Sequence, residues 1–351
     1  MPSGEKSDSP RARTRKGGSA SFAIGGKTAR ANHIPLGRGS ADDSISKVCS
    51  SNDRNFRLWV VRDMSKRWNM RHSPIGWVAR KAVRLIYRAK HPSNAPVTYQ
   101  LPGPTQIRLY PEGEIAEFLS FPRLFERHEL KLVATFLKPG MRVVDVGANI
   151  GLYSILGASR VGDAGRVWAF EPSRESYDRL LRNLELNRCG CVQPIQAALG
   201  DAPNRSSTLL SDAGYGDAYR YLSPASEHES RGASGEVVRE TTLDACAAEY
   251  GINRIDFIKI DVEGGEYRVL LGAKETLSAN QNVRVVFESE ADWCERAGCR
   301  QQDAFELLRS AGFRLYAWDR AKKNWTSDER ELLRAGMVWA SRSGVPIAVS
   351  A

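Results

Sequence analysis

Met141-Arg-Val-Val-Asp-Val-Gly-Ala-Asn-Ile-Gly-Leu-Tyr-Ser154 runs from a strand-forming segment through a glycine-rich turn into an apolar helical pattern. Its first part, residues 142–146, is rich in β-branched residues and predicts a buried strand. Gly147, Asn149 and Gly151 follow at once and predict a sharp turn. Doubly wound α/β folds bind nucleotides where a strand ends and a helix begins, so the sequence predicts a nucleotide site at this turn.

The acidic residues around the turn indicate which nucleotide it binds. The dinucleotide fingerprint is Gly-x-Gly-x-x-Gly, whereas here Gly147 and Gly151 are four residues apart and Asp145 precedes them. S-adenosylmethionine carries no pyrophosphate, and its ammonium and ribose hydroxyls need carboxylate or carbonyl acceptors. Glu171 closes the apolar run 167–170, at the distance where an acid accepts both ribose hydroxyls in Rossmann-like sites. The residues therefore favour S-adenosylmethionine over NAD.

Apolar periodicity and turn residues predict the other elements. Helices are expected at residues 125–137, 173–187, 242–250 and 304–312, strands at 142–146, 167–170, 192–199, 255–260, 283–287, 313–318 and 337–340, and a short hairpin or extended arm at 96–110. The span Ala202–Glu240 is poor in large aliphatic residues and is either a long excursion or a weak hairpin of Ser207–Leu210 with Val237–Thr241. Segments of this length are functional lids or disordered, so a substrate-covering role is one interpretation.

A second informative segment is the strand at 255–260 with its acidic exit, Asp261-Val-Glu263-Gly-Gly-Glu266. In a parallel sheet whose strand 142–146 binds the cofactor, the strand on the other side of the topological switch ends beside the reactive atom of the cofactor. If the strand 255–260 is that neighbour, Asp261 lies near the methyl donor and the acceptor. Three acids in six residues also suit a hard cation, which prefers oxygen ligands. Alternatively, Glu263 and Glu266 complement the dipole of the following helix.

Composition predicts one globular core with appended segments. The chain has 351 residues, of which 42% are hydrophobic and 9% aromatic, enough to bury a sizeable core. No apolar run approaches eighteen residues and no secretory signal is evident. The six cysteines show no disulfide or zinc spacing and are expected to be reduced thiols of a cytoplasmic protein. The Arg- and Ser-rich start also resembles an organellar transit peptide.

The net charge of +10 originates in the N-terminal region. Residues 1–90 hold 20 Lys/Arg and 6 Asp/Glu, whereas the rest holds 31 basic and 35 acidic residues. A domain that binds nucleic acid is itself basic, whereas residues 91–351 carry a slight excess of acidic residues. A nucleic-acid substrate is therefore disfavoured. We expect a disordered basic tail at 1–51, a helical and extended segment at 52–115, and the site-bearing domain at 116–345. Residues 75–86 predict an amphipathic basic helix, which either contacts an anionic membrane peripherally or docks on the domain.

Five motifs follow one another at characteristic intervals: Asp145-Val-Gly-Ala-Asn-Ile-Gly151, Phe170-Glu-Pro172, Ala198-Leu-Gly-Asp201, Thr242-Leu-Asp244 and Lys259-Ile-Asp-Val-Glu-Gly264. In this order they resemble the FkbM family of S-adenosylmethionine-dependent methyltransferases, over residues 132–287 and more loosely to Trp339. The resemblance implies a class I methyltransferase fold, a Rossmann-like seven-stranded sheet ending in an antiparallel hairpin. It implies methyl transfer to a hydroxyl of a carbohydrate, polyketide or other secondary metabolite. It assigns cofactor binding to Asp145, Gly147, Asn149, Gly151 and Glu171, and the reactive end to Asp261 and Glu263.

Direct displacement is the expected mechanism, because a sulfonium is already an activated methyl donor and the protein has to align an oxygen nucleophile. A hydroxyl of high pKa needs a base or a cation to remove its proton. Asp261 is the first candidate for this base, Glu263 and Glu288 follow, and His128 is the outside candidate. Ala198, at the end of the third strand, is expected beside the adenine, although packing equally explains a small residue there.

Three other functions stay open from the residues alone. An NAD-dependent oxidoreductase would use the same sheet. A non-catalytic protein would bind membrane surfaces through its basic N-terminal segment. A nucleic-acid methyltransferase would hold its substrate with that segment.

Overall fold

The computed structural model describes residues 95–101, 103–110, 127–211, 220–223, 235–319, 322 and 324–345. The predicted tail at 1–51, the predicted helix at 75–86 and most of the segment 52–115 lie outside the described residues, so these expectations stay predictions. None of the helices within the described ranges combines the length and the hydropathy that a membrane crossing requires.

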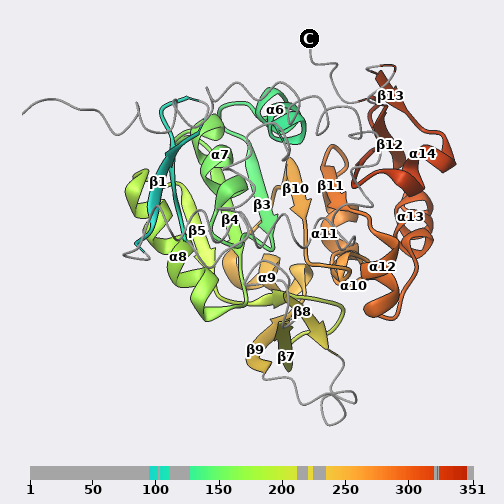
Figure 1. Cartoon of the computed structure of the whole chain (residues 1–351). Helices are drawn as coiled ribbons and strands as arrows, with labels where there is room; N and C mark the ends of the chain where they lie inside the picture. The colour runs from blue at the N-terminus through green and yellow to red at the C-terminus, as the bar shows by residue number, and fades with distance from the viewer. Residues whose placement is uncertain are drawn as a thin grey trace, which may run out of the picture. The chain divides into compact units, whose positions relative to one another are not determined.

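The centre of the described region is an eight-stranded mixed sheet in the order β13-β12-β14-β11-β10-β3-β4-β5 (Figure 1). In that order the strands are Asn324–Thr326, Arg314–Asp319, Met337–Ser341, Arg284–Glu288, Phe257–Ile260, Arg142–Val146, Arg166–Phe170 and Val192–Ile195. The strands β11, β10, β3, β4 and β5 are parallel. β14 is antiparallel to both β11 and β12. This order confirms the predicted class I arrangement with its antiparallel end.

One more strand than the predicted seven is present, because β13 pairs with β12 at the edge of the sheet. Trp318 and Trp325 face each other across this pair, with ring centroids 5.3 Å apart in an edge-on arrangement. The short strand has only three residues, which is why its sequence pattern did not reveal it.

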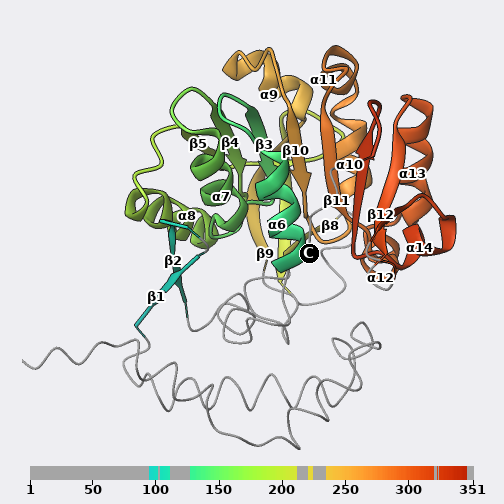
Figure 2. The same ribbon diagram turned by 90° about the horizontal axis from the view of Figure 1, so that it is seen from above.

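Helices cover both faces of the sheet (Figure 2). The helices are α6 (Arg127–Phe136), α7 (Leu152–Val161), α8 (Arg174–Leu186), α9 (Leu243–Tyr250), α10 (Glu266–Leu271), α11 (Lys274–Ala279), α12 (Ala291–Arg296), α13 (Gln301–Ser310) and α14 (Glu329–Arg334). Apolar side chains of α6, α7 and α8 pack in one cluster, and those of α9, α10, α11, α13 and α14 pack in another. The four longer predicted helices are confirmed.

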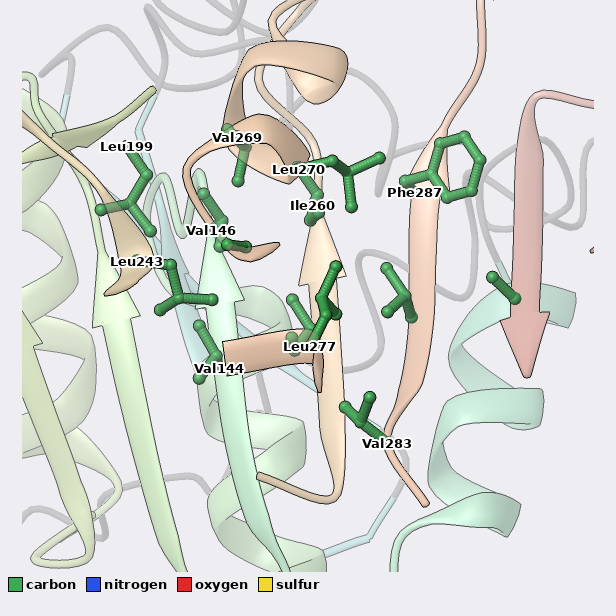
Figure 3. Packing of buried hydrophobic residues seen from close by; sticks show 14 of the residues in the cluster. Val144, Val146, Leu199, Leu243, Ile260, Val269, Leu270, Leu277, Val283 and Phe287 are labelled. Atoms are coloured by element: carbon green, nitrogen blue, oxygen red, sulfur yellow. The ribbon is translucent and has the colours of Figure 1, made fainter. Parts of the chain in front are cut away.

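The continuous apolar character of the central strands follows from burial on both faces. Val144 and Val146 of β3 contribute to the cluster that contains α9, α10 and α11, whereas Val143 contributes to the opposite cluster. Figure 3 shows Val144 and Val146 on β3, with Leu243 beside them and Ile260 on the neighbouring strand β10. These side chains are at most 1% exposed.

The excursion at 202–240 forms most of a second, four-stranded sheet in the order β6-β9-β7-β8. Its strands are β6 (Ala198–Leu199), β7 (Arg205–Ser211), β8 (Arg220–Ser223) and β9 (Gly235–Thr241). β7 and β9 are antiparallel, with Thr208 opposite Val237, so the hairpin interpretation is confirmed.

The predicted single strand at 192–199 is wrong, since the structure divides it between the two sheets. The amide of Ala197 donates to the carbonyl of Ile195 at 3.0 Å, and this tight turn ends β5. Ala198 and Leu199 then pair in parallel with Glu240 and Thr241 as β6.

The predicted hairpin at 96–110 is confirmed as β1 (Val97–Gln100) and β2 (Gln106–Leu109). Asn183 of α8 and Asn187, the residue at its C-terminal cap, hold β2 in place. Asn183 Oδ1 accepts from the amide of Arg108 and Asn187 Oδ1 from the amide of Gln106, each at 2.7 Å.

Candidate functional site

The turn after β3 requires the residues that occupy it. Gly147, Asn149 and Gly151 all have left-handed backbone angles, with φ of 74°, 49° and 96°. A Cβ on Gly147 would lie 1.9 Å from the carbonyl oxygen of Asp261, so only glycine fits there. A Cβ on Gly151 would lie 2.6 Å from Leu180 Cδ1. Asparagine tolerates this conformation better than most residues with a side chain.

Glu171 follows β4 and is tied directly to the turn. Its Oε2 accepts a hydrogen bond from the amide of Asn149 at 2.8 Å, and its Oε1 accepts one from the amide of Ser173 at 2.9 Å. Glu171 is 7% exposed, and burial raises its pKa to about 7 despite these two bonds. The predicted ribose acceptor is therefore a fixed, buried carboxyl beside the turn.

Asp145, near the end of β3, lies beside a lysine that the sequence analysis did not single out. Its Oδ2 accepts from Ser154 Oγ at 2.6 Å, and its Oδ1 lies 3.6 Å from Lys259 Nζ. Lys259 stands opposite Asp145 in the register of β10 with β3. Lys259 Nζ also donates to the carbonyl of Gly147 at 3.1 Å and lies 3.2 Å from Asp261 Oδ2.

These contacts join three strand ends into one site. β3 and β10 are neighbours, and β4 and β11 lie outside them, so the topological switch falls between β3 and β10. Asp145, Glu171 and Asp261 therefore meet at one edge of the sheet, through Asn149 and Lys259. The convergence predicted from the sequence is present.

Three carboxylates meet at the ends of β10 and β11. Carboxylate oxygens of Asp261, Glu263 and Glu288 all lie within 4.8 Å of one another. Burial raises the pKa of Glu288 well above its usual range, and the charges of Asp261 and Glu263 raise it further. Carboxylates this close repel one another, and either a shared proton or a hard cation relieves that repulsion.

Glu266 does not belong to this group of oxygens, although the sequence placed it among the cation or dipole candidates. Its side chain is 3% exposed, and its Oε1 accepts from the amides of Val262 at 3.0 Å and Gly264 at 3.3 Å. Burial raises the pKa of Glu266 to about 7. Glu266 thus holds the backbone of the acidic loop, residues 261–266, through its buried carboxylate.

Two other predicted residues lie differently. Ala198 belongs to β6 and packs with Leu209 and Val238 in the small sheet, where it is 4% exposed. His128 lies in α6, and its side chain falls outside the described part of the chain.

The small sheet attaches beside Glu171. Arg220 of β8 donates to Ser173 Oγ, and Ser173 donates its amide to Glu171. The amide of Arg174 donates to Glu236 Oε1 of β9 at 2.8 Å. Both contacts fall at the N-terminus of α8, next to Glu171, so the excursion is anchored beside the candidate site.

A buried ion cluster fixes the other side of the small sheet. Glu240 of β9 is fully buried and accepts from Arg205 Nη2 at 2.5 Å and from Arg268 Nη2 at 3.0 Å. Ser207 also donates to it. Because Arg268 belongs to α10, this cluster joins the small sheet to the helix that follows the acidic loop.

Sequence reasoning missed Lys259 and the buried role of Glu266. The signal for Lys259 was present: it is the only charged residue of the apolar strand Phe257–Ile260, and its side chain is 4% exposed. A lone charge in a buried strand needs a partner, and the strand register supplies Asp145.

The fold is the α/β fold of a class I methyltransferase. Residues 145–315 match the family described as the methyltransferase FkbM domain. The methyltransferase sdnD of Sordaria araneosa is 30% identical over 218 residues, which cover 55% of this chain and 80% of that protein. The chain therefore belongs to the FkbM methyltransferase family.

Two further relatives carry more specific names. The hexuronic acid methyltransferase AglP of Haloferax volcanii is 26% identical over 170 residues, 48% of this chain and 61% of that protein. The 2-O-methyltransferase NoeI of Sinorhizobium fredii is 27% identical over 188 residues, 50% of this chain and 75% of that protein.

Proposed function

We propose that the protein transfers the methyl group of S-adenosylmethionine to a hydroxyl oxygen of a small-molecule or glycan acceptor. The observation that carries this proposal is the meeting of Asp145, Glu171 and Asp261 around the glycine turn. Membership of the FkbM family supports methyl transfer. The names of AglP and NoeI, which refer to a hexuronic acid and to 2-O-methylation, support a sugar hydroxyl as acceptor.

The residues present fit this cofactor. Each oxygen of Glu171 accepts one backbone N–H, and a carboxylate offers about four acceptor positions, so room remains for two ribose hydroxyls. The Asp261 side chain is 28% exposed, whereas its partner Lys259 is buried, so Asp261 presents an acceptor for the ammonium. We assign the cofactor to Asp145, Gly147, Asn149, Gly151, Glu171 and Asp261, and not to the predicted Ala198, which packs with Leu209 and Val238 in the small sheet. The bound cofactor supplies a methyl group activated by its positive sulfonium.

Among the three acids, we assign the general base to Glu288. A base works best when its pKa lies near the working pH, and burial and like charges raise the pKa of Glu288 in that direction. Asp261, the first candidate from the sequence, is already engaged by Lys259 and is assigned to binding. The nearby charge of Glu263 raises the pKa of Glu288, which strengthens Glu288 as a proton acceptor.

Calorimetry with S-adenosylmethionine and with NAD tests the cofactor. We expect binding of S-adenosylmethionine, and Glu171→Ala should weaken it more than tenfold, because hydrogen bonds to a charged group contribute about 1.5–3 kcal/mol each. Glu185→Ala, an exposed acid of α8, is the matched control and should leave the affinity unchanged. Unchanged affinity in Glu171→Ala would remove the ribose assignment, and binding of NAD alone would replace the transferase with an oxidoreductase.

Transfer of a labelled methyl group to sugars and to cell extracts, with mass spectrometry of the product, tests the reaction. Once an acceptor is found, Glu288→Gln should lower kcat by about 10²- to 10⁴-fold, the usual contribution of a general base, and leave cofactor affinity nearly unchanged. Glu275→Gln, an exposed acid of α11, is the control. A kcat for Glu288→Gln equal to that of the control would exclude Glu288 as the base.

A further inference from the structure

Two cysteines that the proposed chemistry does not use are brought together by a helix end. The helix α12 ends in a Schellman motif, in which Gly298 has φ of 78° and donates its amide to the carbonyl of Glu295 at 3.1 Å. The amide of Cys299 donates to the carbonyl of Cys294 at 2.9 Å, closing the wider ring of the motif. The side chains on either side of this bond characteristically touch. In this chain both are thiols, and Cys299 Sγ also lies 3.4 Å from the carbonyl oxygen of Cys294.

The same thiols rest on the acidic loop at 261–266. The single S–H of Cys299 has two carbonyl acceptors, Gly264 with a sulfur to oxygen distance of 3.6 Å and Cys294 at 3.4 Å. Gly264 is packed so closely that a Cβ there would lie 2.2 Å from the carbonyl oxygen of Trp293. The end of α12 and the loop that carries Asp261 therefore share a rigid contact, and Cys299 supplies one of its hydrogen bonds.

The two thiols have complementary properties. Cys299 is partly exposed, and the hydrogen bond from Cys294 lowers its pKa. Cys294 is buried, and its bond to Cys299 raises its pKa. Burial raises the pKa of Cys189 and of Cys246 to about 11, so these thiols are poorer attacking groups than Cys299.

We propose that Cys294 and Cys299 form a reversible disulfide that loosens the acidic loop and weakens binding at the site. Its effect on cofactor affinity rests on the proposed function. Disulfides need Cα atoms roughly 4.4–6.8 Å apart, a separation that the closed turn between the two residues favours. The bond removes the S–H donor of Cys299, so the carbonyl of Gly264 loses a partner.

The oxidant is a low-molecular-weight disulfide such as glutathione disulfide. The Cys299 thiolate attacks one of its sulfurs and releases one glutathione thiolate. The Cys294 thiolate then attacks the Cys299 sulfur of the mixed disulfide and releases the second. The two thiol protons pass to the two glutathione thiolates, the protein loses two electrons, and glutathione disulfide gains two.

The full chain is titrated with glutathione disulfide, its free thiols are blocked, and its peptides are mapped by mass spectrometry. We expect a peptide linked through Cys294 and Cys299, which dithiothreitol reverses. In the linked form, hydrogen exchange of residues 261–266 should be faster than in the reduced form. The dissociation constant for S-adenosylmethionine should rise about three- to tenfold, the equivalent of one lost hydrogen bond.

The variant Cys299→Ser keeps a donor for Gly264 and should show neither the linked peptide nor the two changes, whereas Cys189→Ser, at a partly exposed thiol, should behave like the unchanged chain. A pair that stays reduced, or a linked pair with unchanged exchange at 261–266, overturns the inference. If the reduced chain does not bind S-adenosylmethionine, the proposed function fails, and the linked peptide and the exchange rates still decide the inference.

Discussion

Lys259 is a buried ammonium that makes three polar contacts within the site. It lies between Asp145 and Asp261 and donates to the carbonyl of Gly147. A buried ion pair adds little net stability when both charges are present, but removing one partner leaves the other charge uncompensated. Asp145 is fully buried, and its carboxylate contacts Lys259 and the hydroxyl of Ser154.

We expect Lys259→Met to lower the free energy of unfolding by about 3–5 kcal/mol, the usual cost of breaking a buried pair. The double variant Lys259→Met with Asp145→Asn should regain part of this loss, because no buried charge then lacks a partner. Urea denaturation measures both. The control is Arg254→Met, whose exposed pair with Asp256 is worth at most about 1 kcal/mol. Equal losses for the two single variants would show that Lys259 does not hold the site.

Some site residues could be predicted and others could not, for a physical reason. Asp145 and Glu171 stand at fixed places relative to a strand end, and this position alone implies their neighbours. Lys259 acts through a partner on another strand, so its role depends on the register of β10 with β3. Glu266 looked like a helix-capping or cation-binding acid, and only the folded loop shows it buried.

At the level of elements, the turn after β3 is held by the loop after β10. Gly147 and Gly140 both have positive φ, 74° and 81°, but their surroundings differ. A Cβ on Gly147 would meet the carbonyl of Asp261, whereas a Cβ on Gly140 would meet nothing within 4 Å. The two positions therefore separate the cost of the backbone conformation from the cost of a clash.

We expect Gly140→Ala to lower the free energy of unfolding by about 1–2 kcal/mol, the cost of a left-handed conformation. Gly147→Ala adds the clash with Asp261 and should cost about 3 kcal/mol or more. It should also abolish cofactor binding, which Gly140→Ala should retain. Thermal denaturation and calorimetry measure the two effects. Similar losses in both variants would mean that the turn and the loop are not in contact in solution.

The elements that the sequence predicted are those with a continuous local pattern. The central strands are apolar on both faces and their helices have an apolar face, so their existence and type follow from short windows. The division of residues 192–199 did not follow, because the partner of β6 is Glu240–Thr241, forty residues later. The prediction of the strand order in the main sheet rested on the family resemblance, because the pattern of a single strand does not reveal its neighbours.

For the molecule as a whole, the site gathers buried acids whose ionisation opposes folding. Burial raises the pKa of both Glu171 and Glu266 from near 4.5 to about 7. Between these values the folded chain binds more protons than the unfolded chain, so the free energy of unfolding falls as pH rises. Below about pH 4.5 both states are protonated, and above about pH 7 the loss is complete.

We therefore expect the chain without cofactor to be more stable at pH 5.5 than at pH 7.5, by a few kcal/mol at most if both groups act. Glu171→Gln and Glu266→Gln each remove one ionisation and should flatten the dependence, and the double variant should keep only the part that Glu288 contributes. Urea denaturation at several pH values measures the slope. Glu185→Gln is the control and should keep the pH dependence of stability, since this residue of α8 is exposed.

Because ribose hydroxyls donate to an ionised carboxylate, cofactor affinity should change in the opposite sense and rise through about pH 7. Stability and binding that respond to pH in the same direction would contradict the assignment of Glu171 to the ribose.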